Sequence, residues 1–327
     1  MTTTERLQAI LHHRHPDRLP LVEWAGWWDA TIRRWHQEGL PPSCTDRYDI
    51  CRHFTLDVWK QTWISVRGPG LPSPPRHGGG IIATMDDYLA LRPKLLPGLG
   101  DCAYLSGWNQ ERALGDIGTW FTCEGFFWFA RSLLGVEEHL LAFYDQPELL
   151  HRINQDLADW MIAIIPQLAS HCRFDFMTFA EDLSYNHGPM ISPTQFHEFL
   201  TPYYQQVIPI LHEHGIVPLV DSDGDVAAII PDFITAGLAG LLPLERQAGV
   251  DVVALRHHHP DVVFIGGFDK MTMSHGETAM RKEFERLLPA AQAGRFAIAC
   301  DHQTPPEVSY QNYRCYRRLF EEYATQL

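Results

Sequence analysis

Short apolar runs that end in polar residues recur along the second half of the chain. The runs occupy residues 175–182, 216–225, 240–245, 262–269 and 294–302. Amphipathic segments separate them, and the segment after residue 190 has Ser192 or Thr194 to cap a helix and Gly215 to end it. Alternation of this kind predicts βα units and a parallel sheet.

The first half of the chain is less regular but compatible with the same architecture. Residues 19–24 are the expected first strand, and residues 118–125 form another. Residues 67–88 are rich in Gly and Pro, so we expect a loop insertion near 67–90 that ends in a small hairpin. The whole chain, 1–327, is therefore predicted to be a single α/β domain. Its expected architecture is a somewhat distorted (β/α)8 barrel of the TIM type with an N-terminal extension.

Ionisable residues stand at the end of every apolar run. In such barrels the functional residues lie where the strands end, whereas surface loops would scatter charges over both ends. We therefore interpret these residues as an active-site rim. They are Glu181, Asp182, Asp221, Asp223, Glu245, Asp269, Asp301 and His302.

The stretch DSDGD, residues 221–225, does not fit a calcium loop. Counted from Asp221, the sixth and twelfth positions hold Val226 and Asp232, where an EF-hand loop needs Gly and Glu. Asp225 is better placed to cap the helix that follows.

Composition narrows the functional class. The formal net charge of −14 argues against a surface that tracks nucleic-acid phosphates. No apolar stretch is long enough to cross a bilayer, and the first twenty residues lack the apolar core of a secretory signal. Seven cysteines without a CxxC pair suggest free thiols in a reducing compartment. We expect an acidic cytoplasmic protein that binds neither nucleic acid nor membrane.

Five segments, in order along the chain, carry a resemblance to a known family. They are TERLQAILHHRHPDRLPL, EGFFWFARSLLGVEEHLLAFYDQPELLHRI, GPMISPTQFHEFLTPYYQQVIPILHEHG, GGFDK and CDHQTPPEVSYQNY. Together they resemble the uroporphyrinogen decarboxylase superfamily, which includes decarboxylases and cobalamin-dependent, zinc-containing methyltransferases. The resemblance implies a distorted (β/α)8 barrel with a deep pocket at the strand ends, often as a homodimer.

One departure from the family pattern argues against uroporphyrinogen as the substrate. True decarboxylases carry an RQAGR-type motif that holds substrate carboxylates, and this chain has EWAGW at residues 23–27. Glu23 and Trp27 replace the two arginines, so the eight carboxylates of that substrate would lack cationic partners. The resemblance therefore favours the methyltransferase branch, with Glu23, Trp24 and Trp27 in substrate binding.

The methyltransferase branch holds zinc with an HxCG motif and a later Cys. Here the corresponding positions carry Asp221, Asp223 and His302. Two carboxylates and an imidazole suit zinc first, with iron or manganese as alternatives. The resemblance thus implies a divalent metal and a corrinoid carried by a partner protein.

The remaining rim residues receive roles with a structural alternative beside each. Glu181, Asp182 and His302 are candidate acids or bases, although an ion pair or a cap would also explain the carboxylates. Arg131, Tyr185 and Glu245 are assigned to substrate binding, although an exposed arginine or a local salt bridge is common.

Three functions remain open at this point. The leading hypothesis is methyl transfer from a small aromatic or methoxylated donor to a corrinoid protein. The second is metal-independent decarboxylation of a small carboxylated or tetrapyrrole-like substrate, in which Arg131 or Lys270 would hold the departing carboxylate. The third is a ligand-binding barrel without catalysis.

Overall fold

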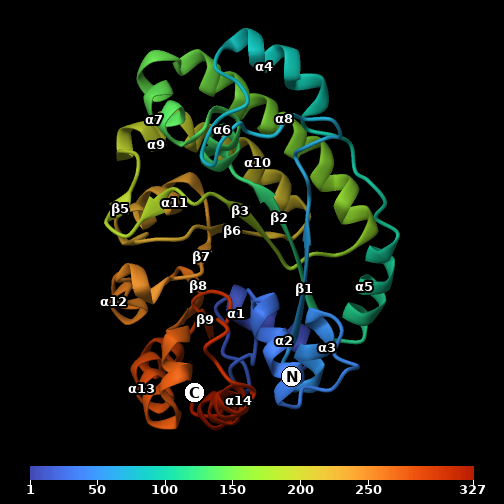
Figure 1. The fold of residues 1–327 in the computed structure, drawn as a ribbon, viewed down its shortest axis with the longest axis vertical. Helices are drawn as coiled ribbons and strands as arrows, with labels where there is room; N and C mark the ends of the chain where they lie inside the picture. The colour runs from blue at the N-terminus through green and yellow to red at the C-terminus, as the bar shows by residue number, and fades with distance from the viewer.

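A computed structural model describes all of residues 1–327, and its centre is a curled sheet of seven parallel strands (Figure 1). The strands follow the order β1 (Val58–Trp63), β2 (Ile117–Glu124), β3 (Phe176–Ala180), β6 (Val217–Asp221), β7 (Gly240–Leu242), β8 (Val263–Phe268) and β9 (Phe296–Cys300). A small antiparallel hairpin of β4 (Ser184–Tyr185) and β5 (Gly188–Pro189) follows β3. The predicted α/β barrel architecture is confirmed.

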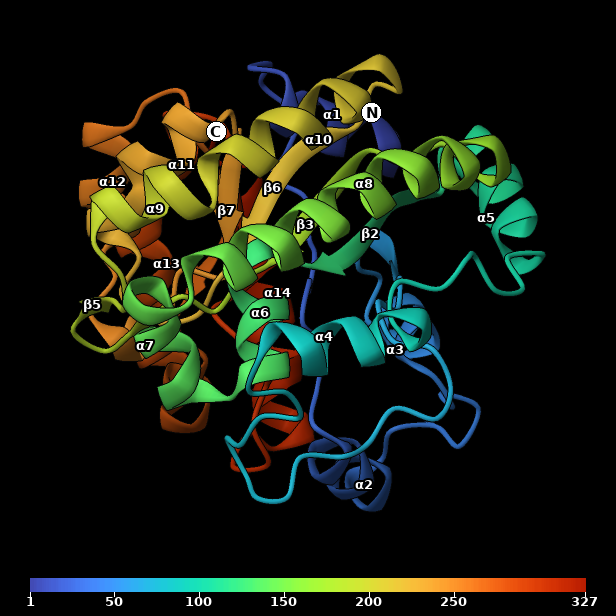
Figure 2. The ribbon, with the colours of Figure 1, turned by 90° about the horizontal axis from the view of Figure 1, so that it is seen from above.

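Fourteen α-helices surround this sheet, most of them on its outer face. They are α1 (Thr3–Leu11), α2 (Asp29–Glu38), α3 (Arg47–His53), α4 (Met85–Leu91), α5 (Tyr104–Ala113), α6 (Phe126–Leu134), α7 (Val136–Asp145), α8 (Pro147–His171), α9 (Pro193–Phe199), α10 (Thr201–Glu213), α11 (Ile230–Ala236), α12 (Val252–His258), α13 (Glu277–Gln292) and α14 (Tyr310–Ala324). Figure 2 shows α8 and α10 side by side along β3 and β6. As predicted, Ser192 caps α9, and Gly215 follows α10 with a φ of +68°. No helix is both long and apolar enough to span a membrane.

The expected first strand, residues 19–24, is not a strand. The segment lies between β9 and β1, where the Asp57 N–H donates to the Leu21 carbonyl and Trp24 Nε1 donates to the Cys300 carbonyl. Pro20 has no N–H, and the Leu21 N–H is taken by the Asp57 carboxylate at 2.8 Å. Positions 20 and 21 therefore have no backbone N–H available for hydrogen bonds to a neighbouring strand. As a result, the sheet has seven strands instead of eight.

The insertion near 67–90 also differs from expectation. Its predicted hairpin is absent, and the segment makes only isolated bridges, between Arg67 and Leu95 and between Gly79 and Gly135. Instead α4 begins here, because the Thr84 side chain accepts the Asp87 N–H while the Asp87 carboxylate accepts the Thr84 N–H. This capping box favours a helix over a hairpin.

Apolar side chains fill the inside of the curled sheet. A cluster of 15 buried residues includes the rings of Trp59, Trp120 and Phe176, and Trp120 stacks on Phe176 at 4.9 Å. Leu7 and Ile10 of α1 belong to the same cluster and close the end at which the strands begin. The interior is therefore a packed core, and only the opposite end, where the strands terminate, is open for a site.

Candidate active site

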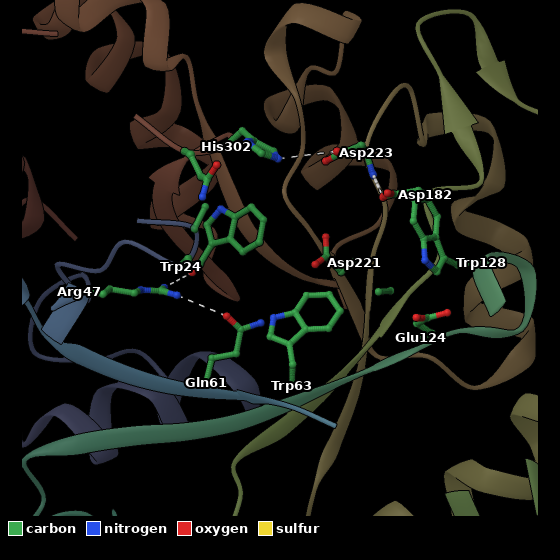
Figure 3. A pocket seen from close by; sticks show the side chains of 13 residues that line it. Trp24, Arg47, Gln61, Trp63, Glu124, Trp128, Asp182, Asp221, Asp223 and His302 are labelled. Atoms are coloured by element: carbon green, nitrogen blue, oxygen red, sulfur yellow. Dashed lines mark hydrogen bonds and ion pairs between the residues drawn. The ribbon is translucent and has the colours of Figure 1, made fainter. Parts of the chain in front are cut away.

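A cavity of about 480 Å³ lies at the C-terminal ends of the strands (Figure 3). Its floor follows from the sheet register, because Glu124 pairs with Ala180 and Ala180 pairs with Asp221. Alternation along each strand turns these three neighbours to the same side of the sheet. All three line the cavity.

Three aspartates converge on this cavity. Asp221 points into its centre, and its carboxyl oxygens receive no hydrogen bond from the protein. Asp182 accepts the Asp223 N–H at 3.2 Å, and the Asp223 Oδ2 lies 3.8 Å from His302 Nε2. Asp182 has a φ of +40°, a conformation that non-glycine residues rarely adopt and that is common at functional sites.

The surroundings of these aspartates favour their protonated forms. Desolvation, reinforced by the charges of Asp182 and Asp223, raises the pKa of Asp221 well above its usual range. Desolvation also raises the pKa of Asp223 to about 7. Burial lowers the pKa of His302, against the attraction of Glu245. The cavity thus holds carboxyl groups that retain protons near neutral pH.

Indole rings form the walls around the acidic centre. Trp24, Trp63 and Trp128 line the cavity, and Figure 3 shows their rings around the Asp221 carboxyl. Arg47 also lines it, but its guanidinium donates to the backbone carbonyls of Glu23 and Trp24. The site is therefore flat-walled, aromatic and acidic, and the one arginine that lines it is occupied by the backbone.

Comparisons with known proteins identify the family. The family model described as uroporphyrinogen decarboxylase (URO-D) matches residues 121–323. The chain belongs to this family. The predicted membership is thereby confirmed.

Individual relatives of this URO-D family protein are distant. Uroporphyrinogen decarboxylase 2, chloroplastic, of Arabidopsis thaliana is 26% identical over 148 residues, which is 45% of this chain and 33% of that protein. The uroporphyrinogen decarboxylase of Crocosphaera subtropica is also 26% identical over 148 residues, or 37% of its length. The matches thus span about a third of these relatives. A methyltransferase from Methanosarcina mazei has the same fold, with a TM-score of 0.67 over 99% of both chains at 15% identity.

Five of the residues predicted from the sequence line the cavity. They are Trp24, Asp182, Asp221, Asp223 and His302. The strand-end rule therefore located the acidic centre of this URO-D family protein.

Glu181, predicted as a catalytic residue, has a structural position instead. Its carboxylate is fully buried and accepts the N–H groups of Phe126, Phe127 and Trp128 at 2.8, 2.7 and 3.2 Å. The Tyr204 hydroxyl donates to the same carboxylate. Because these N–H groups begin α6, Glu181 fixes the start of the helix that carries Trp128.

Glu23 and Trp27 do not reach the cavity, which corrects their predicted role in substrate binding. Glu23 is buried and accepts the Cys300 N–H at 3.1 Å and the Tyr313 hydroxyl at 3.3 Å. Trp27 packs on Trp35 and on Tyr313 at centroid distances of 6.0 and 5.7 Å. Both side chains tie the segment after α1 to α14 and β9, so only Trp24 and Ala25 between them face the site.

The other three predicted substrate-binding residues lie around the cavity and not on its lining. Tyr185 is 51% exposed on β4. Glu245 accepts the Gly224 N–H at 2.9 Å and thereby holds the loop that carries Asp223. Arg131, on α6, lines a neighbouring cavity.

The residues predicted to bind a metal are only partly assembled. Asp223 and His302 approach each other, but no three His, Cys, Asp or Glu side chains are arranged to hold one metal ion. The donor set suits zinc chemically, whereas its present geometry does not fit a three-residue site. We therefore derive no step through a metal, and metal binding stays a prediction.

Several lining residues were not assigned an individual role from the sequence. They are Arg47, Gln61, Trp63, Glu124, Trp128 and Gln303. The strand-end rule could have identified Glu124, because Glu124 ends the correctly predicted strand at 118–125. Gln61 and Trp63 lie on β1, which the sequence pattern did not reveal as a strand.

Proposed function

We propose that the protein transfers a methyl group from a small aromatic or methoxylated donor to a corrinoid protein, with acid assistance from the cavity. The observation that carries the proposal is the composition of the site. Three aspartates stand within three indole walls, and the single arginine of the lining, Arg47, directs its guanidinium to the backbone carbonyls of Glu23 and Trp24. Such a site suits a neutral flat molecule and opposes a polyanion.

The chain's own residues can perform the chemistry of the donor side. The indoles of Trp24, Trp63 and Trp128 would stack on the ring and exclude water. As the methyl carbon leaves, the electron pair of the carbon–oxygen bond stays on oxygen, and Asp221 supplies the proton that this oxygen takes up. Asp223 and His302, which are nearer to solvent, would return a proton to the site. A corrinoid supplies the nucleophile that accepts the methyl group.

The proposal is tested with reduced free cobalamin as the acceptor and methoxybenzenes as donors. We expect formation of the phenol together with methylation of the acceptor, read by its absorbance. Asp221→Asn should lower kcat by about 10²- to 10⁴-fold with little change in KM, as removal of a general acid does. Asp225→Asn is the matched control, because Asp225 only caps the next turn through the Ala227 N–H. No phenol from any methoxylated donor would refute methyl transfer.

Decarboxylation is the second candidate, and one observation favours it. Arg131 lies beside the acidic cavity without a carboxylate partner within the protein, so it could hold a departing carboxylate. Lys270 is not free for this role, since it donates to Asp301 at 3.1 Å and to Gln247 at 2.7 Å. Release of CO2 from small aromatic acids without any methyl acceptor would establish this function in place of methyl transfer.

A further inference from the structure

A second cavity of about 290 Å³ adjoins the acidic one. The two cavities share one wall, because Trp128 lines both. The second cavity lies between α6 and the glycine-rich part of the insertion, and we call it the side cavity. Its polar lining is basic, in contrast to its neighbour, and includes Arg67, His77, Arg131 and Ser132.

Arg131 has most of its hydrogen-bonding capacity free. A guanidinium offers five N–H donors, and here only Nη1 is used, in a bond of 3.0 Å to the backbone carbonyl of Asp182. The guanidinium lies over the ring of Trp128, 5.0 Å from its centroid, and its nearest opposing charge, that of Asp182, attracts it without forming an ion pair. Partial burial of a cation without an ion-pair partner is unfavourable, and a bound anion would relieve it.

The other arginine of the side cavity, Arg67, is already paired with a carboxylate. Arg67 makes a bidentate ion pair with Glu124, with N–O distances of 3.1 Å, and Ser132 also donates to Glu124. This pair cancels the charge of Glu124 where the two cavities meet. Arg131 is therefore left without a direct ion-pair partner on its side of Trp128, and only the charge of Asp182 attracts it.

We propose that Arg131 and the side cavity form a subsite for a single carboxylate. This subsite would hold an anionic substituent of the donor while the methyl-bearing part lies beside Asp221. A planar guanidinium binds a carboxylate in a bidentate manner, and Trp128 would stack on the aromatic ring between the two ends. The donor class would then be a methoxylated aromatic acid. This assignment of the donor rests on the proposed methyl transfer, whereas binding of the carboxylate does not.

Calorimetric titration with 3-methoxybenzoate and the uncharged 3-methoxybenzamide tests the subsite. We expect the carboxylate to bind at least ten-fold more tightly than the amide. Arg131→Gln should abolish that preference and leave the affinity for the amide unchanged, while Arg131→Lys should retain part of it. Arg76→Gln is the matched control, because Arg76 is exposed on the same insertion and does not line the side cavity.

The outcomes separate the subsite from the proposed reaction. Arg131-dependent binding of 3-methoxybenzoate without any methyl transfer from it supports the subsite and refutes the function. Suppose that 3-methoxybenzoate and 3-methoxybenzamide donate methyl groups with equal kcat/KM, and that Arg131→Gln changes neither value. This result would overturn the subsite and leave the proposed methyl transfer standing. Equal displacement of the acid by inorganic phosphate and by benzoate would show a general anion site and overturn the preference for an aromatic acid. If Arg131→Gln fails to fold, the affinities of Arg131→Lys decide.

Discussion

Replacement of Asp221 by asparagine should stabilise the metal-free protein at high pH. The Asp221 carboxyl receives no hydrogen bond and faces the charges of Asp182, Asp223 and Glu245. Asparagine has nearly the same shape and no charge. The substitution therefore removes repulsion without leaving a cavity.

The magnitude and its pH dependence follow from the raised pKa of Asp221. Since the folded-state pKa lies above the unfolded value, the folded protein binds more protons, and its stability falls as the pH rises above the usual range of an aspartate. Asp221 is partly exposed in the cavity, and a polar group left without a partner in such a place costs about 1–3 kcal/mol. We expect Asp221→Asn to raise the free energy of unfolding by about 1–3 kcal/mol at pH 8, with almost no effect at pH 4. For a chain of this length such a gain corresponds to roughly 1.5–4 °C in Tm.

Urea unfolding of chelator-treated protein at both pH values measures this effect. Asp225→Asn on the same loop provides the control, because its capping role is open to asparagine as well. A loss of more than about 1 kcal/mol at pH 8 would refute the reasoning, since it would mean that Asp221 makes a favourable contact even without metal.

Three further outcomes are expected. Glu181→Gln should lower the free energy of unfolding, measured in urea, by about 2–4 kcal/mol, because an N–H of α6 loses its acceptor. Glu137→Gln, at an exposed position of α7, should change the free energy of unfolding little. Equal losses in the two variants would contradict the capping role of Glu181. Burial lowers the pKa of His139 to about 3, so the unfolded chain binds the extra proton and stability falls as the pH drops below 6.5. Between pH 7 and 4.5, His139→Phe should remove about 2–3 kcal/mol of the decline in the free energy of unfolding of the wild type. If urea unfolding gives parallel pH profiles for the wild type and His139→Phe, His139 is not the cause of the decline. If the predicted ligands rearrange around a metal, elemental analysis after incubation with zinc, iron or manganese should find one metal per chain, which Asp221→Ala, Asp223→Ala and His302→Ala lose; a metal-free wild type would end the metal prediction.

The sequence pattern predicted every strand of the main sheet except β1. The strands β2, β3, β6, β7, β8 and β9 all fall on expected apolar runs. By contrast, β1 contains Lys60 and Gln61, which interrupt the apolar pattern. Their partners come from elsewhere in the fold, since Lys60 Nζ donates to Glu111 at 2.6 Å and Gln61 Nε2 donates to Thr122 at 2.9 Å. Local periodicity cannot anticipate such tertiary pairing.

Prediction of the site residues from the sequence was limited in a similar way. The rule that functional residues follow barrel strands led to Asp221, Asp223 and His302, all of which line the cavity. It could not separate Glu181 from Asp182, because neighbouring residues at a strand end point in opposite directions. The decision depends on α6, whose first N–H groups hold the Glu181 carboxylate, and on the left-handed backbone that turns Asp182 the other way.

The closure of the barrel by α1 affects the order of events at the site. The cavity ends on the packed layer of Trp59, Trp120 and Phe176, so it has no second exit through the barrel. Small molecules must enter and leave by the same mouth that a macromolecular partner would cover. For the methyl transfer proposed above, the kinetics should therefore follow a compulsory sequence, in which the donor binds first, the partner docks second, and the demethylated product departs only after the partner has dissociated.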